Sequence, residues 1–390
     1  MRRLLIIAIS LIGVLGVATA VATAAGRSGL DGVLSAPSSP DVTVAYEPAA
    51  GATDVSPAAP VAVRADGGTL DQIALRDPQG EPVTGRLNAD RTAWTASEPL
   101  DYGTVYTWSG RATGADNVPV PVQGTVATVK PKDTVRGTLN IGDDRTVGVA
   151  APIRIQFDSH VQDKASVERA LAVRTSRPVE GGWAWLPDEN GGSRVDWRPK
   201  QYWPSGTTVS VDAPLLGVPF GGGDYGKANL STSFTIGRAQ VVKADTRSFQ
   251  MVVLRDGKQV ASYPASYGLA ADPNRNTRSG IHVVSEKFTD KRMTSAQYGY
   301  DVMSRWAVRM SNNGEFIHAN PASASAQGSS NVTHGCVNLS TADAKAYYDS
   351  ALYGDPVEVT GTPVQLSPAD GDISDWTIPW EQWKGMSALR

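Results

Sequence analysis

An internal repeat limits, more than any other feature, how this chain can fold. Trp94 is followed nine residues later by Gly103-Thr104-Val105-Tyr106, and Trp197 is followed nine residues later by Gly206-Thr207-Thr208-Val209. Each copy is also preceded by an Ala-Pro pair and an apolar residue. A motif that recurs in this way indicates that one structural unit is used twice. We therefore expect two related domains, at residues 41–130 and 131–238.

Both copies have the pattern of a β-sandwich. Short runs that alternate apolar and polar residues, such as residues 104–108, are separated by turn pairs such as Asp66-Gly67. The 39 glycines and 25 prolines favour a turn-rich, mainly β protein over a helical bundle. In such a sandwich, Trp94 and Trp197 are expected to be buried between the two sheets.

The other aromatic residues of the second copy leave two readings open. Trp183, Trp185 and Trp203 are either further core residues or a face on which sugar rings stack. His160 follows a predicted strand and has no evident partner, so we expect it on the surface.

The N-terminus has the features of an export signal. Arg2 and Arg3 precede an apolar run that contains two small-x-small cleavage sites and is about long enough to span a bilayer. We expect residues 1–26 to be either a cleaved signal peptide or a retained anchor in the cytoplasmic membrane. Residues 27–40, rich in Gly, Ser and Pro, are predicted to be a linker. Either outcome places the rest of the chain in the cell envelope, outside the cytoplasmic membrane.

A third domain, residues 239–363, is predicted from a new series of strands. Strand-like runs lie at 240–245, 248–254, 259–263, 280–284, 306–310, 316–318 and 356–360, with a hairpin turn at 255–258. A helix is expected after Ser340, which has Asp343 at the capping-box position. The segment 285–305 shows no clear period, and long irregular segments of this kind often form lids.

The candidate site is centred on Cys336, the only cysteine in 390 residues. An unpaired thiol in an exported protein is either reactive or an intermolecular crosslink, and two nearby histidines favour reactivity. A thiol with a pKa of about 8.5 is little ionised at neutral pH, so it needs a base. We favour His318, from a separate strand, as the base. His334, expected on the same strand face as Cys336, would shape the site, and the N–H groups of Gly335 and Cys336 are candidate donors to an oxyanion.

Three other interpretations of these residues are open. Cys336 is a buried, inert thiol in the first. In the second, His318, His334 and Cys336 bind zinc, although no acidic residue or second cysteine lies nearby. In the third, His282 joins the catalytic group; we expect it instead to be a strand residue with a structural partner.

The motif around the cysteine resembles the signature of the L,D-transpeptidase family. His318, fourteen further residues and then Thr333-His334-Gly335-Cys336-Val337-Asn338 match a histidine, a spacer of about that length, and Ser/Thr-His-Gly-Cys-apolar-Asn. The resemblance covers about residues 245–385. It implies two immunoglobulin-like β-sandwich domains followed by an L,D-transpeptidase β-sandwich catalytic domain with a helix after the catalytic cysteine. It also implies that residues 364–390 are a Trp-rich tail packing back on the preceding domains.

The resemblance also implies a role for each matching residue. Cys336 becomes the nucleophile and His318 the general base, while His334 and Gly335 complete the catalytic group. The implied substrate-binding positions are Tyr300, Met293, Asn338, Thr333 and Ala319, of which Tyr300 and Met293 match lid positions. Ala319 stands where relatives often have Ser, but only its carbonyl is needed to orient the imidazole. Ala322 stands where close relatives often have Trp, which affects contacts on the donor side.

The implied activity is acyl transfer between peptidoglycan stem peptides through a thioester on Cys336, giving 3→3 crosslinks. Two alternatives are a hydrolase of stem peptides with the same nucleophile and a wall-binding scaffold. Carbapenems are expected to acylate the cysteine, and no cofactor or metal is expected. The net charge of −3 and the lack of a basic block argue against a nucleic-acid partner.

Overall fold

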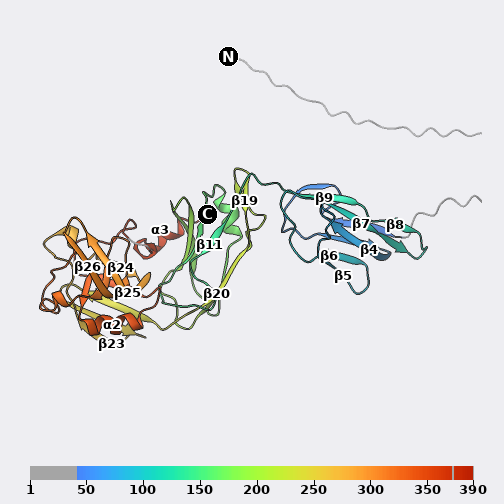
Figure 1. Ribbon diagram of the computed structural model, residues 1–390. Helices are drawn as coiled ribbons and strands as arrows, with labels where there is room; N and C mark the ends of the chain where they lie inside the picture. The colour runs from blue at the N-terminus through green and yellow to red at the C-terminus, as the bar shows by residue number, and fades with distance from the viewer. Residues whose placement is uncertain (1–41, 371–372, 390) are drawn as a thin grey trace, which may run out of the picture.

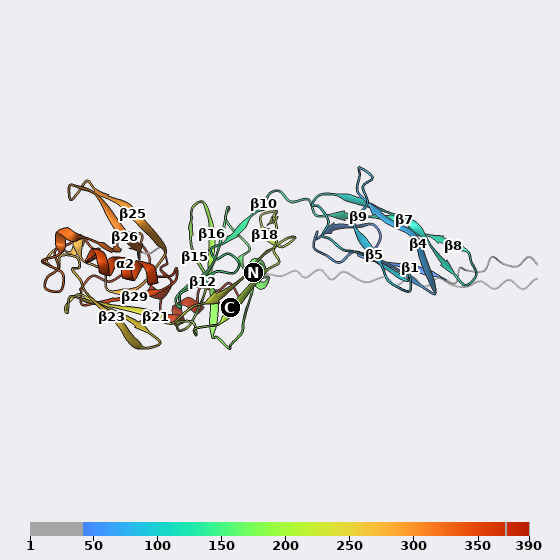
Figure 2. The same ribbon diagram turned by 60° about the horizontal axis from the view of Figure 1, so that its bottom comes forward.

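The structure, a computed structural model, describes residues 42–370 and 373–389. The predicted signal or anchor segment and the predicted linker lie outside these described residues. Three β-rich lobes follow one another along the molecule, from the blue N-terminal lobe to the orange and red C-terminal lobe (Figure 1 and Figure 2). None of the helices in the described ranges is long and apolar enough to cross a membrane.

The first lobe is a sandwich of two sheets, with strand orders β1-β3-β6-β5 and β2-β9-β7-β4 and with β8 beside β7. Its strands are β1 (Thr43–Glu47), β2 (Ala52–Val55), β3 (Ala62–Asp66), β4 (Gly68–Arg76), β5 (Gly85–Leu87), β6 (Ala93–Ala96), β7 (Val105–Gly114), β8 (Pro119–Pro121) and β9 (Gly124–Thr128). Trp94 on β6 meets Trp108 on β7 edge to face, with ring centroids 5.3 Å apart. Both indoles are buried, so Trp94 joins the two sheets as predicted.

The second lobe repeats this plan with sheets β11-β13-β16-β15 and β12-β20-β17-β14 and a small sheet β10-β19-β18. Its elements are β10 (Thr134–Val135), β11 (Gly137–Leu139), β12 (Thr146–Val147), β13 (Ile153–Phe157), α1 (Lys164–Arg169), β14 (Ala172–Thr175), β15 (Gly181–Glu189), β16 (Gly192–Pro199), β17 (Thr208–Ala213), β18 (Pro219–Gly221), β19 (Asp224–Gly226) and β20 (Leu230–Ile236). Trp197, buried as predicted, stacks on Trp203 with ring centroids 4.9 Å apart.

Two readings of this lobe are corrected by the structure. Trp183, Trp185 and Trp203 are each at most 8% exposed and belong to the core, so the sugar-stacking face is wrong. His160 is on the surface as expected, but it has a partner, because its Nδ1 lies 2.6 Å from an Asp188 carboxylate oxygen. The two residues are 28 positions apart, with α1 and β14 between them, so the sequence pattern does not reveal that they meet.

The third lobe consists of sheets β23-β22-β21-β29-β24 and β25-β26-β27-β28 with α2 packed on the second of them. Its elements are β21 (Gln240–Asp245), β22 (Gln250–Arg255), β23 (Lys258–Pro264), η1 (Pro273–Arg275), β24 (Gly280–Val283), β25 (Glu286–Ser295), β26 (Tyr300–Arg309), β27 (Phe316–Ala319), η2 (Pro321–Ser323), β28 (Val337–Leu339), α2 (Thr341–Ser350) and β29 (Pro356–Thr360). At the predicted hairpin turn, Asp256 and Gly257 have φ values of 49° and 75°. Ser340 caps α2 by accepting the Asp343 N–H at 3.1 Å, as predicted.

The segment 285–305, which shows no period in the sequence, is in fact a regular hairpin. β25 and β26 pair antiparallel from Glu286 opposite Arg309 to Ser295 opposite Tyr300. Much of the ribbon is exposed on both faces, so no apolar alternation marks it. The two strands are instead held together by cross-strand ion pairs, including Arg292 with Asp301 at 2.6 Å.

The C-terminal tail leaves the third lobe and packs on the second. It contains η3 (Asp375–Thr377) and α3 (Trp380–Lys384), and α3 contacts β15. Trp383 is fully buried and its Nε1 donates to the Gly182 carbonyl at 2.9 Å. The guanidinium of Arg198 lies 4.7 Å from the Trp383 ring and 4.8 Å from the Trp376 ring. Because the tail covers its outer face, β16 is buried at every position.

Candidate active site

Two neighbouring strands bring the cysteine and one histidine together. β27 and β28 are parallel, with His318 opposite Asn338. Cys336 directly precedes β28. All three side chains line one cavity of about 370 Å³.

The imidazole of His318 is held in one tautomer. Its Nδ1 lies 2.9 Å from the Ala319 carbonyl oxygen. A carbonyl only accepts, so Nδ1 carries the hydrogen and Nε2 keeps its lone pair. This is the contact that the resemblance implies for the residue after the histidine. Burial lowers the pKa of His318, while the Ala319 hydrogen bond acts the other way, so the ring is a neutral base at pH 7.

The thiol is also neutral at rest. Burial raises the pKa of Cys336 to about 12; a backbone hydrogen bond with Phe316 opposes this shift, and the negative charge of Glu315 adds to it. The sulfur donates a hydrogen bond to the Gly314 carbonyl at 3.5 Å. A thiol of this kind becomes nucleophilic only when a base takes its proton at the moment of attack.

The backbone around the cysteine is fixed through its carbonyls. The Cys336 carbonyl accepts from Thr333 Oγ1 and from Asn338 Nδ2, both at 2.9 Å, and the Gly335 carbonyl accepts from Thr277 Oγ1 at 2.7 Å. Gly335 has φ +114°, which favours glycine. Within residues 42–370 and 373–389, neither the Gly335 N–H nor the Cys336 N–H donates a hydrogen bond. Both are therefore free to meet an oxyanion.

His334 does not lie as the sequence suggested. Gly335 breaks the extended backbone, so His334 and Cys336 are not alternate residues of one strand. The exposed His334 ring instead packs on Tyr298 and Tyr300, with centroid distances of 4.5 Å and 5.4 Å. It nevertheless lines the cavity with the thiol.

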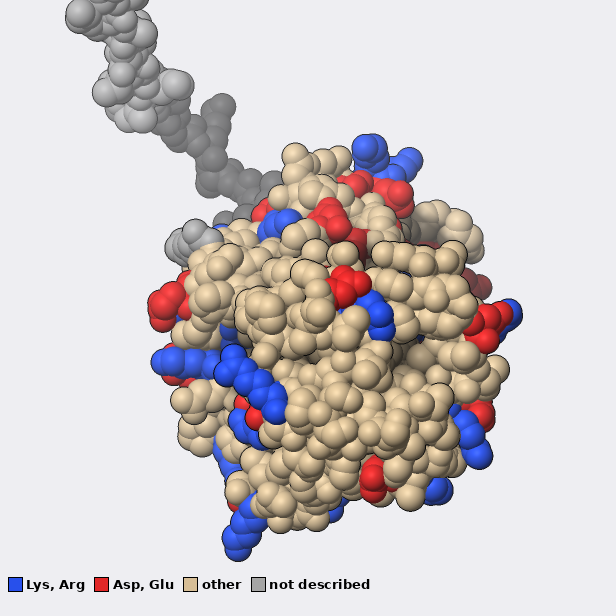
Figure 3. All heavy atoms as spheres, turned by 90° about the vertical axis from the view of Figure 1, so that its left-hand side faces the viewer, with Lys and Arg blue, Asp and Glu red and all other residues tan. Residues whose placement is uncertain are grey.

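The β25–β26 hairpin closes one side of the cavity. Met293 and Tyr300, the predicted lid positions, line it, and so do Ala319, Ala322 and Thr333. Burial, followed by the nearby Cys336, raises the pKa of Tyr300, which stays protonated at neutral pH. Figure 3 looks onto this end of the molecule and shows a broad uncharged surface with Lys and Arg gathered along its left-hand rim.

Two supporting residues were not recognised in the sequence. Arg275 donates to the Thr333 carbonyl at 3.1 Å and to the Val332 carbonyl at 2.7 Å, which holds the segment that leads to the cysteine. After burial, its charge is the next cause of the lowered pKa of His334. The second supporting residue is Tyr298, whose ring packs on His334. The only signal for Arg275 was its position in a polar loop of the catalytic domain.

His282 is a strand residue with structural partners, as predicted. It is buried on β24, its Nε2 lies 2.8 Å from the Arg278 carbonyl oxygen and its Nδ1 lies 3.7 Å from a Glu315 carboxylate oxygen. No group of three or more His, Cys, Asp or Glu residues in the described part of the chain is placed to hold a metal ion.

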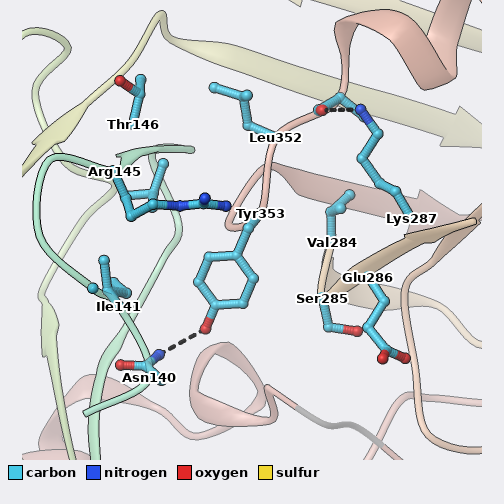
Figure 4. A pocket seen from close by; sticks show the side chains of 13 residues that line it. Asn140, Ile141, Arg145, Thr146, Val284, Ser285, Glu286, Lys287, Leu352 and Tyr353 are labelled. Atoms are coloured by element: carbon cyan, nitrogen blue, oxygen red, sulfur yellow. Dashed lines mark hydrogen bonds between the residues drawn. The ribbon is translucent and has the colours of Figure 1, made fainter.

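A separate cavity of about 410 Å³ lies between the second and third lobes (Figure 4). The Tyr353 hydroxyl accepts from Asn140 Nδ2 at 2.7 Å there, and Lys287 Nζ donates to the Ala351 carbonyl at 2.8 Å. Its lining includes no histidine or cysteine, so the reactive groups belong to the cavity beside β27 and β28.

Comparison with known proteins agrees with this geometry. The model of the L,D-transpeptidase catalytic domain matches residues 239–359, and the model of a bacterial Ig domain matches residues 52–219. The chain is 55% identical to L,D-transpeptidase 5 of Mycobacterium tuberculosis over 90% of this chain and 78% of that protein. It is 36% identical to L,D-transpeptidase 2 of the same species over 87% of this chain and 83% of that protein.

Among solved structures, the chain is similar to an L,D-transpeptidase in complex with imipenem. The match spans 59% of this chain and 99% of that protein's chain, with 31% identity and a TM-score of 0.49. The two relatives match nearly the whole chain, across the sandwich lobes as well as the catalytic one. The chain therefore belongs to the L,D-transpeptidase family and is a cysteine-dependent transpeptidase with immunoglobulin-like domains ahead of its catalytic domain.

Proposed function

We propose that this enzyme forms 3→3 crosslinks in peptidoglycan outside the cytoplasmic membrane. The observation that carries the proposal is the neutral His318, with Nδ1 fixed on the Ala319 carbonyl and Nε2 free, in one cavity with the neutral Cys336 thiol. This pair suits acyl transfer, because the base takes a proton from sulfur and returns it to a leaving amine.

In the first half-reaction, Cys336 Sγ attacks the carbonyl of the third residue of a tetrapeptide stem while its proton moves to His318 Nε2. The N–H groups of Gly335 and Cys336 support the developing oxyanion. The C–N bond to the terminal D-Ala then breaks, the proton passes from Nε2 to the D-Ala amine, and a thioester remains.

In the second half-reaction, the side-chain amine of another stem attacks the thioester. His318 accepts a proton from the attacking nitrogen and returns it to sulfur as the C–S bond breaks. The hairpin residues Met293 and Tyr300 cover the thioester, which favours the amine over water. A carbapenem ring would acylate the same sulfur by the same attack on a carbonyl.

The test is intact-protein mass spectrometry with a disaccharide-tetrapeptide, alone and with excess acceptor stem. We expect an adduct that is absent in Cys336→Ala, and a dimeric 3→3 product once acceptor is added. An adduct that releases only free tripeptide would identify a carboxypeptidase instead. With no adduct at all, wall binding by the sandwich lobes would become the better account.

A further inference from the structure

A second cavity adjoins the first near the thiol. It has a volume of about 600 Å³ and shares Met293, Tyr300 and His334 with the cavity that contains His318. Its lining also includes Gly314, whose carbonyl accepts the hydrogen bond from Cys336 Sγ. The sulfur therefore lies in the first cavity and contacts a residue that lines the second, and the hairpin residues Met293 and Tyr300 border both.

The two spaces differ sharply in charge. No Lys, Arg, Asp or Glu lines the cavity that contains His318. The second cavity is lined by four cationic side chains and no carboxylate: Arg278, Lys291, Arg292 and Arg309. A cavity of this kind attracts an anion and repels an ammonium group.

Three of the four cations already have carboxylate partners. Arg278 pairs with Asp370 at 3.1 Å, Arg292 with Asp301 at 2.6 Å and Arg309 with Glu286 at 2.5 Å. These pairs leave little positive charge for a ligand.

Lys291 is different. Its Nζ lies 4.4 Å from the centre of the Phe288 ring, and among the described residues it makes no ion pair or hydrogen bond. Side chains two apart on a strand share a face, so Lys291 lies on the same side of β25 as Met293, which borders both cavities.

We propose that the Lys291 ammonium binds the free carboxylate of the terminal D-Ala of the donor stem, the residue that leaves during acylation. This inference rests on the proposed function and adds the direction in which the donor lies. The scissile carbonyl would sit at Cys336 with the leaving residue in the cationic cavity. The acceptor, an amine that is protonated before it reacts, would arrive through the uncharged cavity on the His318 side.

The experiment compares two donors, a tetrapeptide stem with a free C-terminal carboxylate and the same stem with a C-terminal amide. Thioester formation on Cys336 is followed by mass spectrometry in the wild type, Lys291→Gln and Lys291→Arg. We expect Lys291→Gln to lower the second-order rate constant about tenfold or more for the free acid and to leave that for the amide unchanged. Lys291→Arg is expected to restore most of the loss. Lys258→Gln, an exposed lysine of the same lobe, is the matched control and should behave as wild type with both donors.

An equal loss with both donors would overturn the proposal, because it would mean that Lys291 acts only through the shape of the hairpin. The same holds if the wild type does not distinguish acid from amide. Failure of the proposed function itself looks different: the wild type would then form no thioester with either donor.

Discussion

Two parts of this protein bury ionisable side chains, with opposite results. Around Cys336 and His318, burial is the main cause of both pKa shifts and keeps both groups neutral. Beneath the C-terminal tail, Arg194 is buried beside Asp196 at 2.6 Å and Asp375 at 3.6 Å. Burial alone would lower the pKa of Arg194, but the negative charges of Asp196, Asp375 and Glu189 more than offset that shift. The pKa is therefore raised overall, and the guanidinium stays charged.

The difference lies in whether the fold supplies a counter-charge. Where none is supplied, burial leaves a neutral thiol and a neutral imidazole, so the proton leaves sulfur only as the sulfur attacks. Where one is supplied, the buried guanidinium stays charged, here between a carboxylate of its own strand β16 and a carboxyl group of the tail. Variants should therefore separate activity from stability.

The largest expected effect comes from removing the base. His318→Gln should lower the rate of thioester formation about 10³-fold, because it removes the imidazole that we assign as the base for Cys336. The free energy of unfolding should change by only about 1 kcal/mol. Acylation kinetics and urea denaturation measure the two quantities. His160→Gln, at an exposed histidine of the second lobe, serves as control; similar acylation rates in the two variants would contradict the role of His318.

Removing the counter-charge under the tail should affect stability instead. Arg194→Met removes the nearer of the two arginines that pair with the buried Asp196, while Arg154 remains at 3.2 Å, and it also removes the cation beside Asp375. It is expected to lower the free energy of unfolding by about 3 kcal/mol. The folded fraction should still be acylated at nearly the wild-type rate. Arg174→Met removes an exposed ion pair with Asp212 and should cost about 1 kcal/mol or less. Equal losses would show that the buried cluster contributes no more than a surface pair.

The pH dependence of acylation tests whether His318 and Cys336 are both neutral at rest. His318 is neutral above its lowered pKa, and the Cys336 thiol is protonated up to a pKa of about 12. The rate of thioester formation should therefore change by no more than about twofold between pH 7 and 9, and it should fall only below about pH 6.5. A rise of about tenfold across that range would indicate a thiolate with an ordinary pKa.

A smaller effect on stability than that of Arg194→Met is expected at Asp375. Burial, and then the negative charge of Asp196, raises its pKa to about 7, whereas the unfolded value is about 4. The folded state thus binds this proton more tightly, and its stabilising effect is present at acid pH and lost as the pH rises through about 7.

Asp375→Asn should remove this dependence. Between pH 5 and 7.5, we expect the free energy of unfolding of the variant to fall by about 2 kcal/mol less than that of the wild type. Chemical denaturation at the two pH values makes the measurement. If the free energy of unfolding changes equally with pH in the variant and the wild type, Asp375 is ionised in the folded protein at both pH values.

Sequence reasoning reached much of the catalytic lobe because its signals are local. The Asp256-Gly257 turn, the Ser340 cap and the strands on either side of Cys336 each depend on a few consecutive residues. The β25–β26 hairpin was missed because its signal is the pairing of two exposed strands, which no single strand displays.

The supporting contacts of the site were missed for the same reason. Arg275 and Thr277 reach the cysteine segment from 57 or 58 residues away, and nothing near them in the chain marks that destination. The tail is similar, since its tryptophans meet Arg198 across roughly 180 residues.

The sequence alone determined the chemistry and the plan of the molecule: one thiol, a histidine at a fixed spacing, a glycine where the backbone turns, and two repeated sandwiches before them. The protonation states of these groups depend on the tertiary structure. Burial without counter-charge keeps Cys336 and His318 neutral, while four cations line the second cavity and none lines the cavity that contains the thiol. These properties depend on which side chains, distant in the sequence, exclude water or supply charge. The order of residues along the chain does not show which side chains those are.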